Sequence, residues 1–317
     1  MPQPTTADVH VSVPLTNISV AYMQEGPSVA ERMFPRVNVT KQANKYYIYS
    51  KNDFNRVQME KRGPGTESAG SGWTMTTSTY YCDVFALHKD IDDQTRGNVD
   101  APLDLDRDAA KFLAGQAKLK WDKQWATDFF AASIWTGSTT GADITVGTVW
   151  STSGSTPIED VAAQQTSIMK KTGKLANKLL IGAEVFSILR NHASVLDRIK
   201  YTSKGVVTAE LLAQIFNVEE VIIGWTMETT SVEGATGTQG FIFGKHALLV
   251  YAPSSPSLME PSGGYTFVWN FPNSNQGQSI SKFRMDKLKS DRLEIEFSFD
   301  CKQTAADVGV FFASCVA

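Results

Sequence analysis

The 317-residue sequence contains few of the residues that build disulfides and metal sites. Its three cysteines are far apart and form no CxxC pair: Cys82, Cys301 and Cys315. Its four histidines form no HExxH, HxH or His–Cys spacing: His10, His88, His192 and His246. These patterns exclude a disulfide framework and the usual zinc motifs. We expect the cysteines to be small buried side chains in a reducing compartment, and we expect no bound metal.

The sequence also lacks long apolar runs and an excess of either charge. No window approaches the roughly 20 uninterrupted apolar residues that cross a bilayer, so no membrane partner is expected. The first residues, MPQPTTADVH, have neither the basic start nor the apolar run of a signal peptide, which favours synthesis in the cytoplasm. A net charge of −3 argues against a dedicated nucleic-acid binder, because such proteins are usually basic.

Catalytic motifs are missing as well. There is no GxSxG, and the Gly173–Lys174 pair is followed by Leu175 where a phosphate-binding loop needs Ser or Thr. The glycine-rich stretch 234–240 lacks the GxGxxG register. Glu294 and Glu296 fall on one face of an expected strand, where a solvated or intersubunit role is the simpler interpretation. The sequence predicts no enzyme and no cofactor.

One long polar stretch has no apolar side chain large enough to join a core. Residues 60–73 read EKRGPGTESAGSGW, and Trp73 is the first large apolar residue after Met59. Both flanks, 45–51 and 74–89, are rich in aromatic, β-branched and Thr residues, which favour strands. This pattern predicts a hairpin with a long polar tip that cannot fold onto its own core.

The strongest helix signal covers residues 100–130. Apolar side chains recur every four residues and form one stripe: Leu113, Ala117, Trp121, Trp125 and Phe129. Asp104 or Asp106 can cap its start. Some 27 helical residues would span about 40 Å, which suits a strut better than a helix enclosed in one compact domain.

The remaining segments alternate between α/β and all-β patterns. Residues 136–157 are rich in Gly, Ser and Thr and predict a loop or edge hairpin. Helices are expected at 158–173, 183–191 and 207–216, the last capped by Thr208, and strands at 178–182 and 218–224. Two strand-like runs lie within 240–253. From Gly264 onward strands return, and Leu293, Ile295, Phe297 and Phe299 alternate with polar residues.

The order of these parts resembles the major capsid proteins of tailed bacteriophages, whose fold encapsulins share. AERMFPRVNVTKQANKYYIYSK is similar to the family's junction between arm and hairpin, and APLDLDRDAAKFLAGQAKLKWD to its spine helix. LLIGAEVFSILRNHASVLDRIKY and VTAELLAQIFNVEEVIIG resemble its axial domain. GKHALLVYAPSSPSLMEPSGGYTFVW resembles the passage back to the peripheral domain.

The resemblance implies an α+β fold with an N-terminal arm, an extended β-hairpin loop, a long spine helix, a peripheral β domain and an α/β axial domain. The implied parts are an arm at 1–44, the extended loop at 45–90, the spine helix and first peripheral part at 91–157, the axial domain at 158–255, and the returning peripheral strands at 256–317. In the family the extended loop reaches over a neighbouring subunit. Intersubunit contacts at its tip are therefore expected from Arg56, Lys61, Arg62 and Glu67. The spine helix is expected to pack through Leu113, Trp121, Trp125 and Phe129.

The implied function is a structural coat protein that assembles into the icosahedral head around double-stranded DNA. Its implied partners are many copies of itself as hexamers and pentamers, a separate scaffolding protein, a portal, a decoration protein and nonspecifically bound DNA. The arm is too short to include the scaffolding segment of about 100 residues that some members carry. Either a separate scaffold assists assembly, or the sequence is already processed.

Lys61 is a conceivable donor for a covalent cross-link of the kind that some members form, but no acceptor is identifiable, and no cross-link is expected.

Two alternatives remain open from the sequence: an encapsulin-like compartment that encloses enzymes, and an α/β hydrolase or transferase with an unrecognised site.

Overall fold

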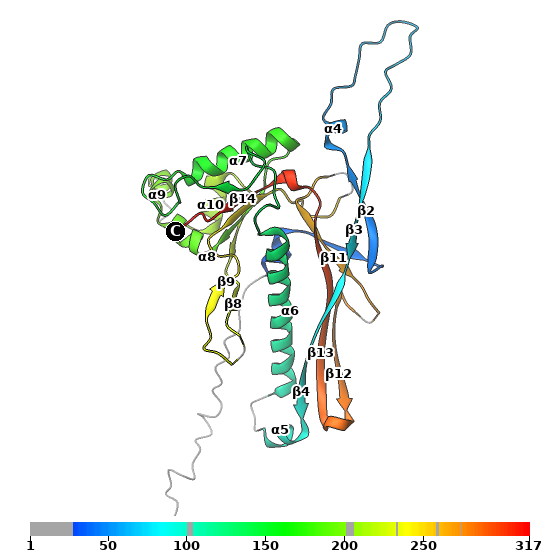
Figure 1. The fold of residues 1–317 in the computed structure, drawn as a ribbon, viewed down its shortest axis with the longest axis vertical. Helices are drawn as coiled ribbons and strands as arrows, with labels where there is room; N and C mark the ends of the chain where they lie inside the picture. Colours follow the sequence, from blue (N-terminus) through cyan, green and yellow to red (C-terminus); the bar gives the residue numbers. More distant parts are fainter. Residues whose placement is uncertain (1–27, 100–103, 201–205, 233, 258–259, 273) are drawn as a thin grey trace, which may run out of the picture.

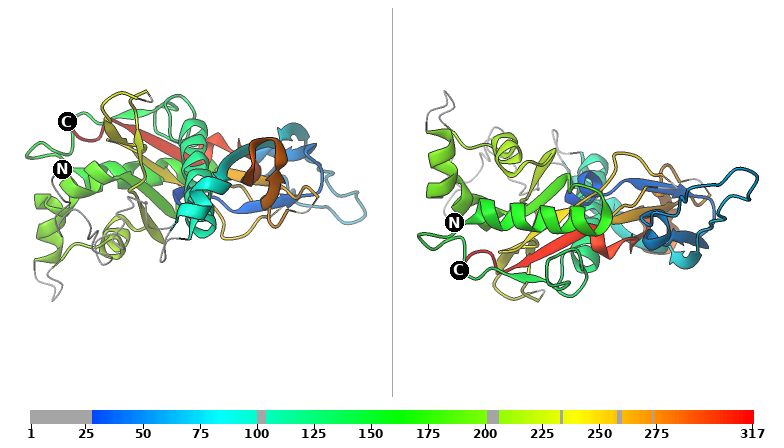
Figure 2. Two further views of the ribbon diagram at one scale, coloured as in Figure 1. Left: turned by 90° about the horizontal axis from the view of Figure 1, so that it is seen from below. Right: turned by 90° about the horizontal axis from the view of Figure 1, so that it is seen from above.

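The computed structural model describes residues 28–99, 104–200, 206–232, 234–257, 260–272 and 274–317. Most of the expected arm, residues 1–27, lies outside these ranges. Two sheets stand on either side of one long helix, and a hairpin projects beyond them (Figure 1). Views from below and above place the hairpin and the helix-rich end at opposite sides of the molecule (Figure 2). The mixture of helix and sheet agrees with the α+β expectation.

The first sheet, called here the helix-covered sheet, has the order β5-β14-β10-β6-β7. Its strands are β5 (Ile144–Thr145), β6 (Lys178–Gly182), β7 (Glu220–Gly224), β10 (Ala247–Val250) and β14 (Gly309–Ala313). β6 and β7 are parallel, whereas β10 is antiparallel to β6 and β14. The central strands are apolar because both faces are covered; all four residues of β10 are buried. Residues 136–157, predicted to be a loop or edge hairpin, are mostly loop, and within them β5 pairs with β14.

Four helices accompany this sheet: α7 (Pro157–Thr172), α8 (Ala183–Arg190), α9 (Ala193–Ile199) and α10 (Ala209–Phe216). Local chemistry explains their ends. α7 starts with Pro157 and stops at Gly173, whose φ of 72° is left-handed and suits glycine. The Thr208 hydroxyl accepts a hydrogen bond from the Leu211 N–H at 3.3 Å and caps α10, as the sequence predicts.

The second sheet, called here the long sheet, is built around β13 (Ser290–Gln303). β4 (Asp83–Asp92) pairs with one edge of β13, while β12 (Gln278–Met285) and β11 (Gly264–Trp269) both pair with it as well. β1 (Arg36–Val39) adds to β11 in parallel. The expected alternation on β13 is confirmed, since Leu293, Ile295, Phe297 and Phe299 are all buried. β12 was not predicted, because QSISKFRM has too few apolar positions to mark a strand.

The long helix α6 (Leu105–Phe129) joins the two sheets and is the spine that the sequence predicts. The helix begins at Leu105, within the expected range 100–130. Asp104 is its cap, as expected, and its carboxylate accepts the Arg107 N–H at 3.1 Å. Near its start it packs on β13 and β4. Toward its end, Trp125 and Phe129 enter a core shared with both sheets. The helix therefore fixes one sheet relative to the other.

The described part of the segment before the hairpin lies along the rest of the molecule. α3 (Val29–Met33) contacts α6 and β7, and Val29, Ala30, Met33 and Phe34 are buried. Phe34 contacts the Phe129 ring with centroids 4.7 Å apart. Residues 28–34 are thus part of the core, and β1 adds to the long sheet. Their few apolar side chains are too sparse to indicate a core alone, but they fill space left by α6.

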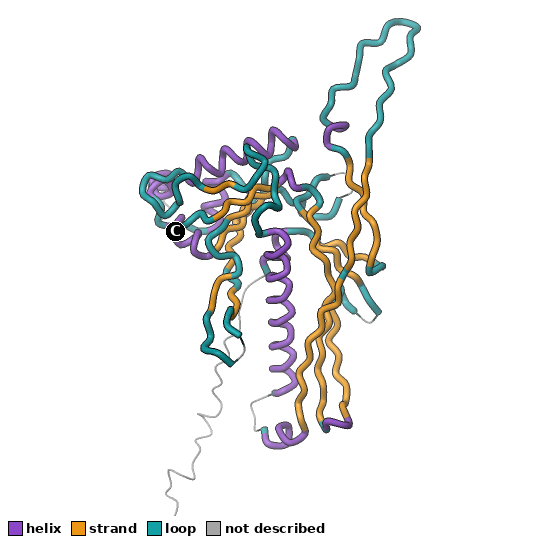
Figure 3. Tube along the Cα trace, viewed as in Figure 1, coloured by secondary structure: helices purple, strands orange, loops and turns teal. Residues whose placement is uncertain are grey.

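Shorter elements complete the described chain. β8 (Met227–Thr229) and β9 (Gln239–Phe241) form a small hairpin, α5 (Asp93–Asn98) follows β4, and two 3₁₀ turns, η1 (Asp286–Leu288) and η2 (Ala306–Val308), flank β13. The tube in Figure 3 separates the strands of the long sheet from the loops at its upper end.

Candidate assembly surface

The projecting hairpin consists of β2 (Ala43–Tyr49) and β3 (Met75–Tyr81), which pair over their full lengths. A short helix, α4 (Lys51–Phe54), follows β2. The second predicted strand, 74–89, is divided: one residue after β3 ends, β4 begins and pairs with β13 instead of β2. Cys82 is that single residue, so one nearly continuous strand runs from the hairpin into the long sheet (Figure 1).

Aromatic side chains anchor the base of the hairpin on the long sheet. The Tyr80 ring stacks on Phe267 of β11 with centroids 4.5 Å apart, and Tyr46 contacts the same ring at 5.4 Å. Lys51 forms an ion pair with Asp307 of η2. The Asp300 carboxylate of β13 accepts the Tyr81 N–H at 2.9 Å. The base is therefore part of the folded core.

The loop above the strands is open and exposed. Among the described residues 56–73, the backbone makes one hydrogen bond to itself, from the Thr66 N–H to the Gly63 carbonyl at 3.3 Å. It closes a turn in which Pro64 and Gly65 are central and Gly65 has φ 77°. That arrangement matches the Pro-Gly preference of a type II turn. The Thr66 hydroxyl also donates to the Gly63 carbonyl at 2.8 Å, so the internal hydrogen bonds of the loop gather at this turn.

Near the strands, side chains of residues 53–54 contact residues 73–74 and join the two ends of the loop. The Asp53 carboxylate accepts hydrogen bonds from the Thr74 N–H and hydroxyl, both at 2.7 Å. These bonds lower the pKa of Asp53. The Phe54 and Trp73 rings stack with centroids 6.3 Å apart. The loop is thereby held out from the molecule and does not fold back onto it.

The four predicted tip residues all lie on this exposed loop: Arg56, Lys61, Arg62 and Glu67. Arg62 donates through Nε to the Thr66 carbonyl, so it shapes the turn. Sequence reasoning missed two neighbours, Val57 and Met59, whose side chains are 91% and 95% exposed. They precede the polar tip, and their position in the expected loop could have marked them. Apolar groups so exposed favour contact with another protein.

The four predicted spine residues are buried within the folded chain. Leu113, Trp121, Trp125 and Phe129 are at most 2% exposed. Leu113 packs with Ile91 and Leu293 under the long sheet. Trp121 meets Phe297 edge to face, with centroids 5.5 Å apart. The stripe therefore holds the scaffold from which the hairpin projects.

Beside the stripe, sequence reasoning missed a buried carboxylate. Asp122 is 0% exposed and accepts three hydrogen bonds. Two come from the start of α3, from the Ser28 hydroxyl at 2.5 Å and the Ala30 N–H at 3.0 Å. The third comes from the Thr226 hydroxyl, just before β8, at 2.9 Å. Asp122 joins the root of the N-terminal segment to the spine helix and to the β8–β9 hairpin.

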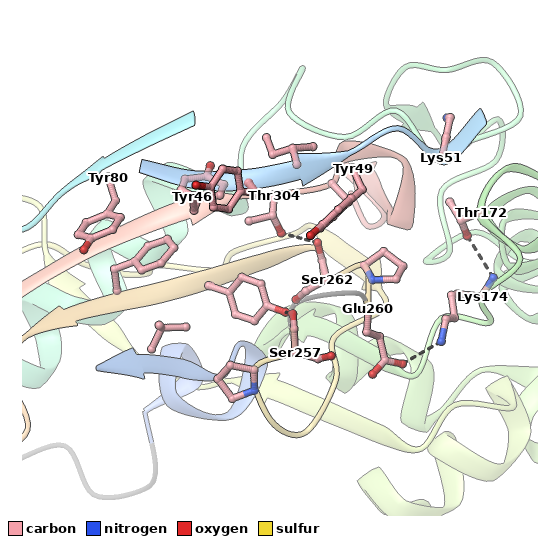
Figure 4. Close-up of a pocket in the computed structure, with 18 of the residues that line it drawn as sticks. Tyr46, Tyr49, Lys51, Tyr80, Thr172, Lys174, Ser257, Glu260, Ser262 and Thr304 are labelled. Carbon is pink, nitrogen blue, oxygen red and sulfur yellow. Dashed lines mark hydrogen bonds and ion pairs between the residues drawn. The ribbon is translucent and has the colours of Figure 1, made fainter. Parts of the chain in front are cut away.

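A cavity of about 590 Å³ lies under the base of the hairpin (Figure 4). Its walls are mainly apolar and include Tyr46, Tyr49 and Tyr265. At its edge, Lys174 and Glu260 form an ion pair at 2.8 Å, which lowers the pKa of Glu260 and raises that of Lys174. Lys174 and Glu260 neutralise each other, and Lys51 pairs with Asp307, so these charged groups of the cavity wall are already engaged within the chain.

Ser155 and His192 form a pair of the kind that a hydrolase uses as nucleophile and base. The Ser155 hydroxyl lies 2.9 Å from His192 Nε2. The backbone N–H of Ser194 donates to His192 Nδ1 at 3.2 Å, so Nδ1 is the acceptor and Nε2 carries the proton. His192 therefore donates to Ser155, and Ser155 donates to the Thr152 carbonyl at 2.8 Å. This is the wrong tautomer for a general base, and the pair caps α9.

The described ranges contain neither a metal-binding cluster nor a membrane-spanning helix. In that part of the chain, no group of three or more His, Cys, Asp or Glu side chains could hold a metal ion. Within the same residues, none of the helices has the length and apolar character needed to cross a membrane.

Comparison with known proteins gives consistent matches. A family model described as phage major capsid protein E matches residues 137–259. The major capsid protein of Burkholderia phage BcepMu is 24% identical over 257 residues, which cover 80% of this chain and 81% of that protein.

Solved structures match over most of the chain. A phage-related protein from Bordetella bronchiseptica has a TM-score of 0.69 at 18% identity, covering 92% of this chain and 93% of its own. The capsid protein of cyanophage P-SCSP1u has a TM-score of 0.61 at 10% identity, with coverage of 93% and 90%. The SrpI encapsulin of Synechococcus elongatus has a TM-score of 0.59 at 10% identity, with coverage of 100% and 96%.

At these identities the structures establish a shared fold, and both phage coats and an encapsulin have it. The family model and the BcepMu relative both carry the description of a phage major capsid protein. The family-model match, the BcepMu relative and the shared fold together support a structural coat protein of the phage major capsid type.

Proposed function

We propose that many copies of this chain assemble into the closed icosahedral head shell that encloses phage double-stranded DNA. The observation that carries the proposal is the hairpin, which is anchored in the core at its base and extends an open, exposed loop beyond it. A loop with so few internal contacts gains buried area only against a partner.

In this assembly, the loop of each copy lies on the next copy. Such head-to-tail contacts close into rings when the rotation between copies is a whole fraction of a turn, which yields the proposed hexamers and pentamers. Arg56, Lys61, Arg62 and Glu67 supply polar contacts, and Val57 and Met59 supply apolar ones. Each single interface can remain modest, because every copy is held by several neighbours at once.

The remaining partners follow from the same role. DNA would touch the inner face through local basic residues and without sequence specificity, as a net charge of −3 suggests. A separate scaffolding protein, a portal and a decoration protein are the proposed further partners. The mature protein is a virion component, and we place its synthesis and assembly in the cytoplasm of the bacterial host.

Electron microscopy and light scattering of the purified chain test the proposal. Closed shells, or isolated hexamers and pentamers, are the expected result. If the chain is monomeric alone, coexpression with its neighbouring phage genes should restore shells. A chain that stays monomeric under both conditions would contradict the proposal.

The encapsulin alternative is less favoured, because the sequence relative over 80% of the chain is a phage coat protein. The contents of the shells separate the two. Nuclease-protected double-stranded DNA in particles from phage-producing cells supports a head shell, whereas a packaged enzyme supports a compartment.

A further inference from the structure

The hairpin leaves the long sheet at a one-residue junction. Tyr81 is the last residue of β3 and pairs with Ala43, while Asp83 is the first residue of β4 and pairs with Phe299. Cys82 between them belongs to neither strand. Rotation about the backbone at this position would swing the loop relative to the sheet, and the swing would grow with distance from the junction.

A directional bond crosses this junction from the long sheet. Asp300 of β13 accepts the Tyr81 N–H through Oδ2 at 2.9 Å. The Asp300 side chain is 14% exposed, so water competes little for its oxygens. Lys302 lies 3.4 Å from the same Oδ2 and holds the carboxylate from its own strand. A bond between an N–H group and a charged oxygen is stronger and more angle-dependent than a ring contact.

The other contacts between the base and the long sheet are longer or less directional. The Cys82 thiol donates to the Phe267 carbonyl at 3.6 Å, and the Tyr46 hydroxyl donates to the Gln303 carbonyl at 3.5 Å, the outer limit of a hydrogen bond. The Tyr80–Phe267 stack buries area but tolerates sliding and rotation of the rings. The Lys51–Asp307 pair involves a side chain that is 48% exposed on a long flexible stem. The Cys82 N–H bonds to the Gln42 carbonyl at 2.9 Å, which joins the two strands of the hairpin and does not tie them to the sheet.

From this geometry we infer that Asp300 is a positioning residue, which fixes the direction in which the extended hairpin leaves the long sheet. The inference gives the proposed contact between copies a specific determinant, and it rests on that proposed function only for its biological consequence. The hydrogen bond sets the angle at Tyr81, and the angle sets where the loop tip meets a neighbour.

The test measures the hairpin direction in the monomer. Spin labels at Ser68→Cys, near the loop tip, and Lys170→Cys, on α7, report their distance distribution by pulsed electron paramagnetic resonance. Both sites are exposed, whereas the three native cysteines are buried, so labelling is selective. Dilution with unlabelled chain removes signals between copies.

Asp300→Ala removes the acceptor, and Asp300→Val removes it with a β-branched residue that suits strands. Asp300→Asn keeps an acceptor oxygen. The matched control is Asp90→Ala, because Asp90 also lies on the long sheet, where it pairs with Arg292 at 2.7 Å, but does not contact the hairpin.

We expect both non-accepting variants to broaden the distance distribution about twofold and to speed exchange of the Tyr81 amide about tenfold, as loss of a hydrogen bond to a charged group implies. Asp300→Asn and Asp90→Ala should retain the original distribution. An unchanged distribution in a folded Asp300→Val chain would overturn the inference.

Shell formation by each variant is measured separately by electron microscopy. The positioning role of Asp300 and the proposed shell function can therefore be refuted by different results. A broadened distribution with normal shells would keep Asp300 as the positioning residue but would contradict the proposed role of the hairpin in shell formation. An unchanged distribution with lost shells would refute the positioning role and leave the proposed function intact.

Discussion

The Asp122 cluster offers a quantitative test of how the N-terminal segment is held. Asp122→Ala removes the acceptor for three donors, the Ser28 and Thr226 hydroxyls and the Ala30 N–H. The hydroxyls can turn toward other acceptors, but the Ala30 N–H is buried at the start of α3 and cannot. We therefore expect the root of the segment to loosen.

The magnitude follows from these bonds. A hydrogen bond to a charged group contributes about 1.5–3 kcal/mol, so three would sum to about 4.5–9 kcal/mol if they were independent. Removing the carboxylate also removes the cost of burying it, which is several kcal/mol. The expected net loss in the free energy of unfolding is about 3 kcal/mol for Asp122→Ala. For Asp122→Asn it is about 1 kcal/mol, because the amide oxygen can still accept from Ser28 and Ala30.

Urea unfolding followed by tryptophan fluorescence, at a concentration where the chain is monomeric, measures both losses. The control is Asp104→Ala on the same helix, which removes one exposed cap and should cost about 1 kcal/mol. Hydrogen exchange at Ala30 should rise in Asp122→Ala only. A loss below about 1 kcal/mol in Asp122→Ala would mean that burial of the carboxylate cancels its bonds, and the reasoning would fail.

Two further predictions concern packing and charge. Trp125 and Trp135 are both fully buried, but only the Trp135 indole N–H has a partner, the carbonyl of the last residue of α6 at 2.7 Å. Trp135→Phe should therefore lower the free energy of unfolding by about 1–3 kcal/mol more than Trp125→Phe, and equal losses in urea unfolding would contradict this. Hydrogen bonds from Arg96 and Lys282 lower the pKa of Asp106 to about 2. A lowered carboxylate pKa stabilises the fold fully above its ordinary value of about 4, and the effect is lost as pH falls toward 2. The difference in unfolding free energy between the original chain and Asp106→Asn should shrink over that range, and a difference that grows on acidification would refute the assignment.

Sequence periodicity was sufficient where one element buries one face. The four-residue stripe that includes Leu113 and Trp121 predicted α6, and the alternation of Leu293 to Phe299 predicted β13, because both patterns record packing against a neighbour. Gly173 and Thr208 marked helix ends through backbone chemistry that acts locally.

Other features depend on contacts between distant segments. α3 and β1 have few apolar residues; α3 joins the core only through the space beside α6, and β1 is a strand only through its pairing with β11. The change of pairing partner at Cys82 is decided by β13, more than 200 positions later, so the 74–89 strand gives no sign of it. Asp122 and Asp300 appear in the sequence as ordinary charged residues. Their hydrogen bonds exist only once the fold brings their donors within reach.

For the candidate surface, the sequence predicted a polar loop without core residues, and the structure places that loop beyond the sheets. Its exposed apolar pair, Val57 and Met59, was missed because apolar residues are ordinarily assigned to the core. The four predicted tip residues remain proposed contacts until a neighbouring copy is seen.

The most direct test of the central claim is assembly without the loop. Residues 58–71 are deleted in one variant and replaced by Gly and Ser at equal length in a second, and both are compared with the original chain by electron microscopy and sedimentation. The account predicts a folded chain in every case, with unchanged circular dichroism, and closed shells only for the original. Normal shells from the deletion would contradict the claim that the extended hairpin holds neighbouring copies together.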